Sequence, residues 1–157
     1  MIQRVQSLLL FLAAICYVLA CFMPVANLTT ADAYYQFNVW NVRENIPDGR
    51  VVYQVLYIGL SLIALAIFTI VTIFLYKNRM RQSKLCMANV LLGFVVLAVT
   101  LYVYPDVIFQ KISVLRGCTV AFSLKALLPI LGVVLVYIAN KFILRDEKKV
   151  RDADRLR

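Results

Sequence analysis

The sequence contains no histidine, and this absence narrows the chemistry that the chain can perform. Histidine is the usual general base and the commonest transition-metal ligand, so every His-based catalytic triad is excluded. The four cysteines include no CxxC pair, and no glycine-rich phosphate loop occurs. We therefore predict a protein that is not an enzyme and that has no catalytic residues, no cofactor and no metal site.

Charged residues are also scarce: they make up 16% of the 157 residues, whereas 63% are hydrophobic. A soluble domain is nearer half apolar and a quarter charged, so the excess predicts contact with lipid. Four apolar stretches are each long enough to cross a bilayer as a helix. We predict an all-α membrane protein, a single domain (1–157) folded as a four-transmembrane-helix bundle. The predicted spans are about 7–26, 55–76, 85–104 and 119–139.

The basic residues predict the orientation of these spans. Twelve of the 17 lysines and arginines precede the first span, fill the connection 77–84 or follow the fourth span. The positive-inside rule therefore places both termini and this connection in the cytoplasm. The formal charge of +9 is then mainly a topology signal, which favours membrane lipid and not nucleic acid as a partner.

Two segments outside the spans carry structural signals. In the outer loop 27–54, residues 34–42 nearly alternate in polarity, and a Pro-Asp-Gly turn precedes 51–53. This pattern predicts a small extracytoplasmic β-hairpin, and the alternative is an irregular loop on the headgroups. The cytoplasmic tail 141–157 has opposite charges at i,i+4 and a thin apolar stripe, which predicts that the fourth span continues as a charged helix. The alternative is a solvated end that only anchors the span.

Lys125 is the most conspicuous polar residue inside a predicted span. It lies about one turn below the outer boundary, so its ammonium group can reach water, and this snorkelling is the plainest interpretation. Pro129 removes the backbone donor that would pair with the Lys125 carbonyl. Together with Asn89, such a kinked polar patch could line a cavity or bind an anionic headgroup. Asn89, Thr69 and Thr72 are expected to make ordinary hydrogen bonds between helices.

The cysteines and the first span each leave an alternative open. Cys21 and Cys118 both fall toward the outer side, where a disulfide would join them, but buried free cysteine is the default interpretation. Residues 18–21 loosely match a lipoprotein cleavage box. Because the residues that follow are still apolar, a retained first span is favoured over a cleaved signal.

Three segments together carry a family resemblance. They are the start 1–7, the inner connection 76–79 with Gln82 and 85–86, and the end 146–147 with 150–157. They resemble an uncharacterised family of small four-span inner-membrane proteins of the Bacteroidetes, described as a domain of unknown function. The resemblance implies a fold and a bacterial inner-membrane location, and it implies no activity.

All three segments lie on the predicted cytoplasmic face. Our leading hypothesis is therefore a non-enzymatic inner-membrane protein, an accessory or structural subunit that docks on a larger membrane assembly through this face. The alternative is a small transporter or lipid-binding protein that uses a polar intramembrane patch formed by Asn89 and Lys125. A homo-oligomer is compatible with both. The candidate partner contacts are Arg79, Arg81, Lys84, Arg151, Asp152, Asp154, Arg155 and Arg157, which are equally explained as topology signals that hold the helix ends.

Overall fold

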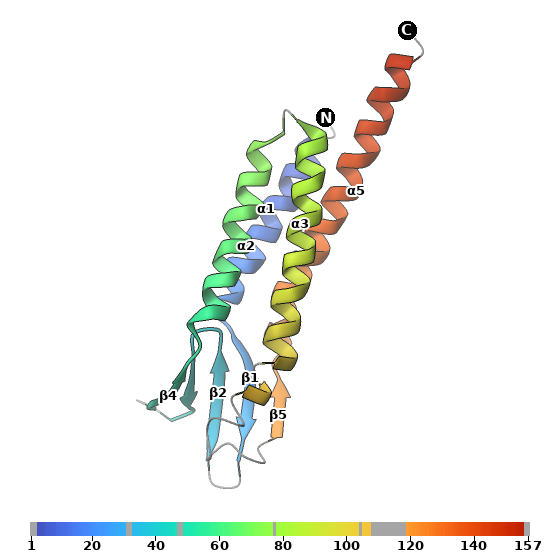
Figure 1. The fold of residues 1–157 in the computed structure, drawn as a ribbon. Helices are drawn as coiled ribbons and strands as arrows, with labels where there is room; N and C mark the ends of the chain where they lie inside the picture. Colours follow the sequence, from blue (N-terminus) through green and yellow to red (C-terminus); the bar gives the residue numbers. More distant parts are fainter. Residues whose placement is uncertain are drawn as a thin grey trace.

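The chain combines a group of long helices with a β-sheet at one end of them (Figure 1). Both termini lie at the end of the helices far from the sheet (Figure 1). A computed structural model describes residues 3–30, 33–46, 49–76, 78–103, 105–107 and 119–155.

Four long helices pack side by side. Helix α1 packs against α2 and α5, and α3 packs against the same two helices, so the four close into a ring. Asn78 caps α3, because its side chain accepts a hydrogen bond from the Arg81 N–H at 3.3 Å. A π-helical turn, η1, extends α3, and a short 3₁₀ helix, η3, leads into α5. The helices are α1 (Gln3–Ala20), α2 (Leu56–Phe74), α3 (Arg79–Ala98), η1 (Val99–Val103), η3 (Leu124–Ala126) and α5 (Leu127–Arg155).

The sheet has five strands in the order β4-β3-β2-β1-β5, and each neighbouring pair is antiparallel. Strand β5 comes from the distant segment before α5 and pairs with β1 over Ala26–Thr29, which ties the two halves of the chain together. The strands are β1 (Pro24–Thr29), β2 (Tyr34–Asn38), β3 (Asn41–Glu44), β4 (Val51–Gln54) and β5 (Thr119–Phe122).

The predicted all-α four-transmembrane-helix bundle is therefore wrong. The predicted first span, 7–26, is helical only to Ala20, and its last residues begin β1 at Pro24. The predicted fourth span, 119–139, begins with β5, and α5 itself begins at Leu127. Hydropathy misplaced both boundaries because a short apolar run that forms a strand has the same composition as the end of an apolar helix.

The hairpin predicted in the outer loop is only part of this sheet. Strands β3 and β4 on either side of the predicted turn are antiparallel, while residues 47 and 48 of the turn itself lie outside the described residues. However, residues 34–42 form two strands and not one, since the chain reverses between Asn38 and Asn41. The flanking strands β1 and β5 give the hairpin the extra neighbours that an isolated pair of strands needs for stability.

The tryptophan after β2 fastens the sheet to the helices. Trp40 Nε1 donates to the Cys21 carbonyl, just after α1, at 2.8 Å. The Trp40 carbonyl accepts from the Val55 N–H, just before α2, at 2.7 Å. Its ring lies so close to Gly59 of α2 that a Cβ there would be 2.6 Å from the ring. One side chain thus sets the spacing between the sheet and two helices.

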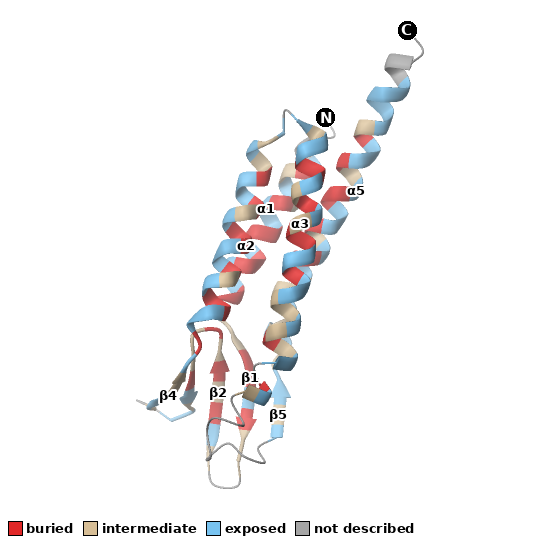
Figure 2. Cartoon of the chain, viewed as in Figure 1, coloured by how far each residue is buried: buried red, intermediate tan, exposed pale blue. Residues whose placement is uncertain are grey.

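The helices expose many apolar side chains, and Figure 2 shows exposed residues along their outer faces. The buried polar residues all belong to the helices or to η1, whereas long apolar side chains face outward, among them Phe11, Ile67 and Phe94. Large exposed apolar surfaces mark contact with lipid or protein. The buried polar residues are Gln6, Thr69, Thr72, Gln82, Ser83, Asn89, Thr100, Asn140 and Asp146.

Within the described residues, three helices are long and apolar enough to cross a membrane. They are Leu56–Phe74, the helix that begins at Arg79, and Leu124–Asp152, while Val5–Ala20 is a shorter apolar helix. These helices are consistent with a membrane protein.

Candidate functional site

Five polar residues from α1, α3 and α5 meet at the end of the helices that carries the termini. Gln6 Nε2 donates to Asp146 Oδ2, and both residues are buried. Arg79 donates from Nη1 to the Asp146 main-chain carbonyl at 3.5 Å. Ser83 Oγ donates to Asn140 Oδ1 at 2.7 Å, one and a half turns earlier on α5. We call Gln6, Arg79, Ser83, Asn140 and Asp146 the α5 anchor.

The α5 anchor is energetically important because a buried polar group without a partner is costly. Asp146 is 8% exposed and Gln6 is 4% exposed, so if one of these side chains is lost, water cannot replace it as the hydrogen-bond partner of the other. Leaving one of them unpaired costs about 1–3 kcal/mol, and more for a charged group. The anchor therefore holds α5 in one position against α1 and α3 at this end.

Beyond Asp146, helix α5 leaves the other helices and projects past their ends (Figure 1). We call this segment, Glu147–Arg155, the α5 arm; at 1.5 Å per residue it is about 13 Å long. Lys148, Lys149, Arg151 and Asp152 are exposed, and Val150 remains 44% exposed. The tail is thus helical, as the sequence predicted, and its apolar position has no cover within the described part of the chain.

The candidate partner contacts fall into three groups. Arg81 and Lys84 are exposed on the first turns of α3, and Arg79 beside them is half-buried and engaged in the α5 anchor. Arg151 and Asp152 are exposed on the α5 arm. The side chains of the remaining predicted contacts lie outside what the structure describes: Asp154, Arg155 and Arg157.

A second polar group lies deeper among the helices, around Asn89. Asn89 Nδ2 donates to Thr69 Oγ1 at 2.7 Å and to the Leu65 carbonyl at 3.4 Å. Asn89 Oδ1 accepts from the Tyr17 hydroxyl at 3.5 Å. The expected bond between α3 and α2 is confirmed for Asn89 and Thr69. Thr72 instead donates within its own helix, and its carbonyl accepts from Gln82.

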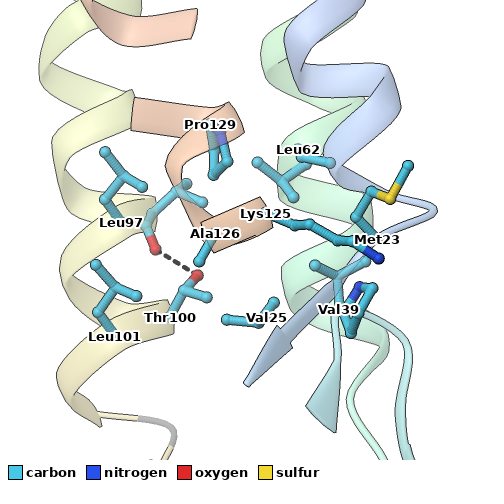
Figure 3. Close-up of a pocket in the computed structure, with 13 residues that line it drawn as sticks. Met23, Val25, Val39, Leu62, Leu97, Thr100, Leu101, Lys125, Ala126 and Pro129 are labelled. Carbon is cyan, nitrogen blue, oxygen red and sulfur yellow. Dashed lines mark hydrogen bonds between the residues drawn. The ribbon is translucent and has the colours of Figure 1, made fainter. Parts of the chain in front are cut away.

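Lys125 lies elsewhere, on η3 at the junction of the helices and the sheet. It lines a small cavity together with Pro129, Met23 and Thr100, and Figure 3 shows its side chain extending between Met23 and Val39. The cavity has a volume of about 20 Å³, which is room for a single water molecule. Asn89 does not line it, so the structure does not bring the two residues of the predicted polar patch together.

The cysteines that the structure describes are packed in the interior of the protein. Cys16, Cys21 and Cys86 are buried free thiols, and Cys21 Sγ donates to the Tyr17 carbonyl at 3.4 Å. Cys118, the second cysteine of the disulfide that was left open as an alternative, lies outside the described residues. In the described part of the chain, no group of three His, Cys, Asp or Glu residues could hold a metal ion.

The family model described as "Domain of unknown function (DUF4293)" matches residues 2–156. The chain belongs to this family. No curated protein matches it.

Membership in DUF4293 confirms the resemblance to a family of unknown function, while the host lineage stays a prediction. The structure adds a physical link between the segments that carried this resemblance. Gln6 comes from the first segment, Arg79 from the second and Asp146 from the third, and all three meet in the α5 anchor.

Sequence reasoning did not identify the α5 anchor as a site. Arg79 was predicted as a partner contact, whereas Ser83 and Asn140 were not singled out at all. The signal that could have found them is the presence of uncharged polar residues at the inner edges of apolar runs, where a hydrogen bond is needed if the residue is buried. Which of these residues pair is not encoded locally, since Gln6 and Asp146 are 140 positions apart.

Proposed function

We propose that this chain is a multi-pass protein of a bacterial inner membrane, with both termini in the cytoplasm. Support comes from the exposed apolar faces of the helices and from the positions of the basic residues. Arg81 and Lys84 lie at the same end as the α5 arm, and the sheet lies at the other end (Figure 1). The positive-inside rule favours the cytoplasm for the end that carries these cations.

We further propose that the protein is a non-enzymatic accessory or structural subunit that docks on a larger membrane assembly through this face. The observation that carries the proposal is the α5 arm, an exposed helix that projects from the other helices while the α5 anchor fixes its base. A helix held in one orientation loses little freedom on binding, so its charges and its apolar position can be used for recognition at low entropic cost.

The α5 arm also has the composition of an interaction surface. Val150 offers an apolar contact, and exposed charged residues of both signs, among them Lys149, Arg151 and Asp152, lie on the same helical arm. Charged groups around an apolar centre give an interface its specificity and speed its association. We expect the partner to present an apolar contact for Val150 with charged groups of both signs around it.

Site-specific photo-crosslinking in intact cells tests the proposal. A photoreactive residue in place of Val150 should give a discrete adduct with another protein. The same residue in place of Tyr34, which is 67% exposed on the sheet, is the control and should give no such adduct. Arg151→Glu should weaken the Val150 adduct, because it reverses a charge beside the contact. Adducts that contain only lipid or only this chain would contradict docking on another protein.

A further inference from the structure

A groove runs along the outer surface of the helices, in the part of the α2–α3 seam that is nearer the sheet (Figure 1). It consists of two hollows of about 170 and 320 Å³, which share Ser61 and Val96 and therefore adjoin each other. Buried side chains form its floor, among them Ile58 and Leu65, and exposed ones form its walls. This seam groove, as we call it, is defined by Tyr57, Ser61, Ala64 and Phe68 of α2 and by Leu92 and Val96 of α3.

The spacing of residues on α2 accounts for the open space. The four residues of α2 that define the groove follow one another at intervals of four, three and four, so they share one face of the helix. Ser61 and Ala64, in the middle of this face, have short side chains. The rings of Tyr57 and Phe68 stand at its two ends. The space between the helices is therefore left open over about three turns of α2 and is bounded at both ends.

Toward the termini, hydrogen bonds hold α2 and α3 together. Asn89 Nδ2 donates to Thr69 Oγ1 at 2.7 Å. About two turns nearer the start of α3, Gln82 Nε2 donates to the Thr72 carbonyl at 3.2 Å. The two helices are therefore joined directly from Thr69 onward, and the seam groove ends at Phe68, immediately before the first of these bonds.

The length of the seam groove selects among apolar occupants. From Tyr57 to Phe68 the helix rises about 16 Å, at about 1.5 Å per residue. The hydrocarbon core of a bilayer is about 30 Å thick, so one leaflet contributes about 15 Å. A transmembrane helix of a partner is about 10 Å wide and crosses both leaflets over about 20 residues. The groove is therefore matched to the acyl chain of a lipid in one leaflet and is too short for such a helix.

The lining of the seam groove also favours an apolar ligand. Ser61 Oγ donates to the Ile58 carbonyl at 2.7 Å, and Thr100 Oγ1 donates to the Val96 carbonyl at 2.7 Å. Both hydroxyl donors are thus used within their own helices. None of the described residues that line the groove is charged. Atoms that border a hollow lose dispersion contacts on that side, and an acyl chain restores them without any polar group.

We propose that the seam groove holds one acyl chain of a phospholipid from the leaflet on the side of the sheet, which is the outer leaflet in the proposed orientation. The chain enters beside Tyr57, which is 77% exposed, and ends beside Phe68 and Leu92. The lining holds the chain and not the headgroup, so phospholipids with different headgroups fit. This inference rests on the membrane location proposed above and not on docking through the α5 arm.

Native mass spectrometry of the full chain, released from micelles that contain either phosphatidylcholine or phosphatidylglycerol, tests the proposal. Lipids that only surround the helices are lost on release, whereas a lipid whose chain is held in a groove is retained. We expect one phospholipid per protein chain, with the two headgroups retained equally to within about threefold. The absence of retained lipid, or a larger preference for one headgroup, would overturn the assignment.

Variants that fill the groove test its position. Ala64→Phe should reduce lipid retention about tenfold or more, because the new ring occupies the place of the acyl chain. Ser61→Leu fills the neighbouring part of the groove and should act in the same direction. Ala98→Phe adds the same ring at an exposed position of α3 that does not line the groove, and it should leave retention unchanged. Circular dichroism of each variant confirms that it remains folded. Unchanged retention in both filling variants would refute the proposal.

Photo-crosslinking in phosphatidylcholine vesicles tests the direction of the chain. The probe is a phospholipid that carries a diazirine at the end of one acyl chain. Its adducts should map to Phe68 and Leu92 and should disappear in Ala64→Phe, whereas adducts at Tyr57 would place the chain in the other leaflet and refute the proposal. Carbonate extraction of the same vesicles reports membrane insertion separately. An inserted protein without these adducts refutes only the seam groove, whereas a protein that is extracted refutes the membrane location as well.

Discussion

Replacing Gly93 by alanine would place a methyl group where α3 and α5 touch. A Cβ at this position would lie 2.6 Å from Val133 Cγ2, whereas carbon atoms pack best at about 3.5–4.0 Å. Val133 is 3% exposed and β-branched, so it cannot simply rotate away in a helix. Such overpacking costs about 1–3 kcal/mol, and the better helix propensity of alanine returns up to about 1 kcal/mol. We expect Gly93→Ala to lower the free energy of unfolding by about 1–2 kcal/mol.

A second substitution tests whether this contact is the cause. Val133→Ala removes the colliding atom and alone should cost about 1 kcal/mol through lost packing. In the double variant two methyl groups are lost from α5 and one is added on α3, so the collision is gone and the net loss at the contact is a single methyl group. The double variant should therefore be at least about 1 kcal/mol more stable than the sum of the two single effects predicts. Reversible unfolding in mixed micelles with increasing dodecyl sulfate measures all four free energies.

The control for this cycle is Leu92→Ala. Leu92 is next to Gly93 but 52% exposed on the outer face of α3, so its truncation should change the free energy of unfolding by less than about 0.5 kcal/mol. If the Gly93 and Val133 effects add within about 0.5 kcal/mol, the two residues are not coupled. The close approach of α3 and α5 would then be refuted.

Three further predictions concern the buried polar residues and the orientation. Asn89→Leu should lower the free energy of unfolding by about 1–2 kcal/mol in the same assay, and Thr69→Val by about 0.6 kcal/mol, because interhelical hydrogen bonds are lost; no change in Asn89→Leu would contradict this. Asp146→Leu should speed trypsin cleavage of the α5 arm severalfold, since Gln6 loses its acceptor, whereas Asp146→Asn keeps an acceptor oxygen and should cleave like wild type; equal rates for both variants would argue against the anchor. If the termini are cytoplasmic, a green fluorescent protein fused after residue 157 should fluoresce, and alkaline phosphatase inserted at Gly49 should be active. The reverse pattern would show that the orientation in the membrane is the opposite of the one proposed.

The local composition of the sequence was sufficient to predict those features that depend on the residues of one segment alone. The span predicted at 55–76 agrees closely with α2, Leu56–Phe74, because this segment is mostly apolar, contains no charged residue and is flanked by Gln54 and Lys77. The charged tail was predicted as a helix and is part of α5. The bond between Asn89 and Thr69 was also expected, since a polar residue in an apolar helix needs a partner on a neighbouring helix.

Other features depend on which segments become neighbours, and local composition does not contain that information. Residues 24–26 and 119–122 were predicted as the ends of apolar spans, and they belong to strands because β1 and β5 pair with each other in the sheet. The same applies to the α5 anchor. Gln6 and Asp146 become a buried pair only when α1 and α5 pack together, since a hydrogen bond depends on the relative position of two groups and hydropathy is a property of each residue alone.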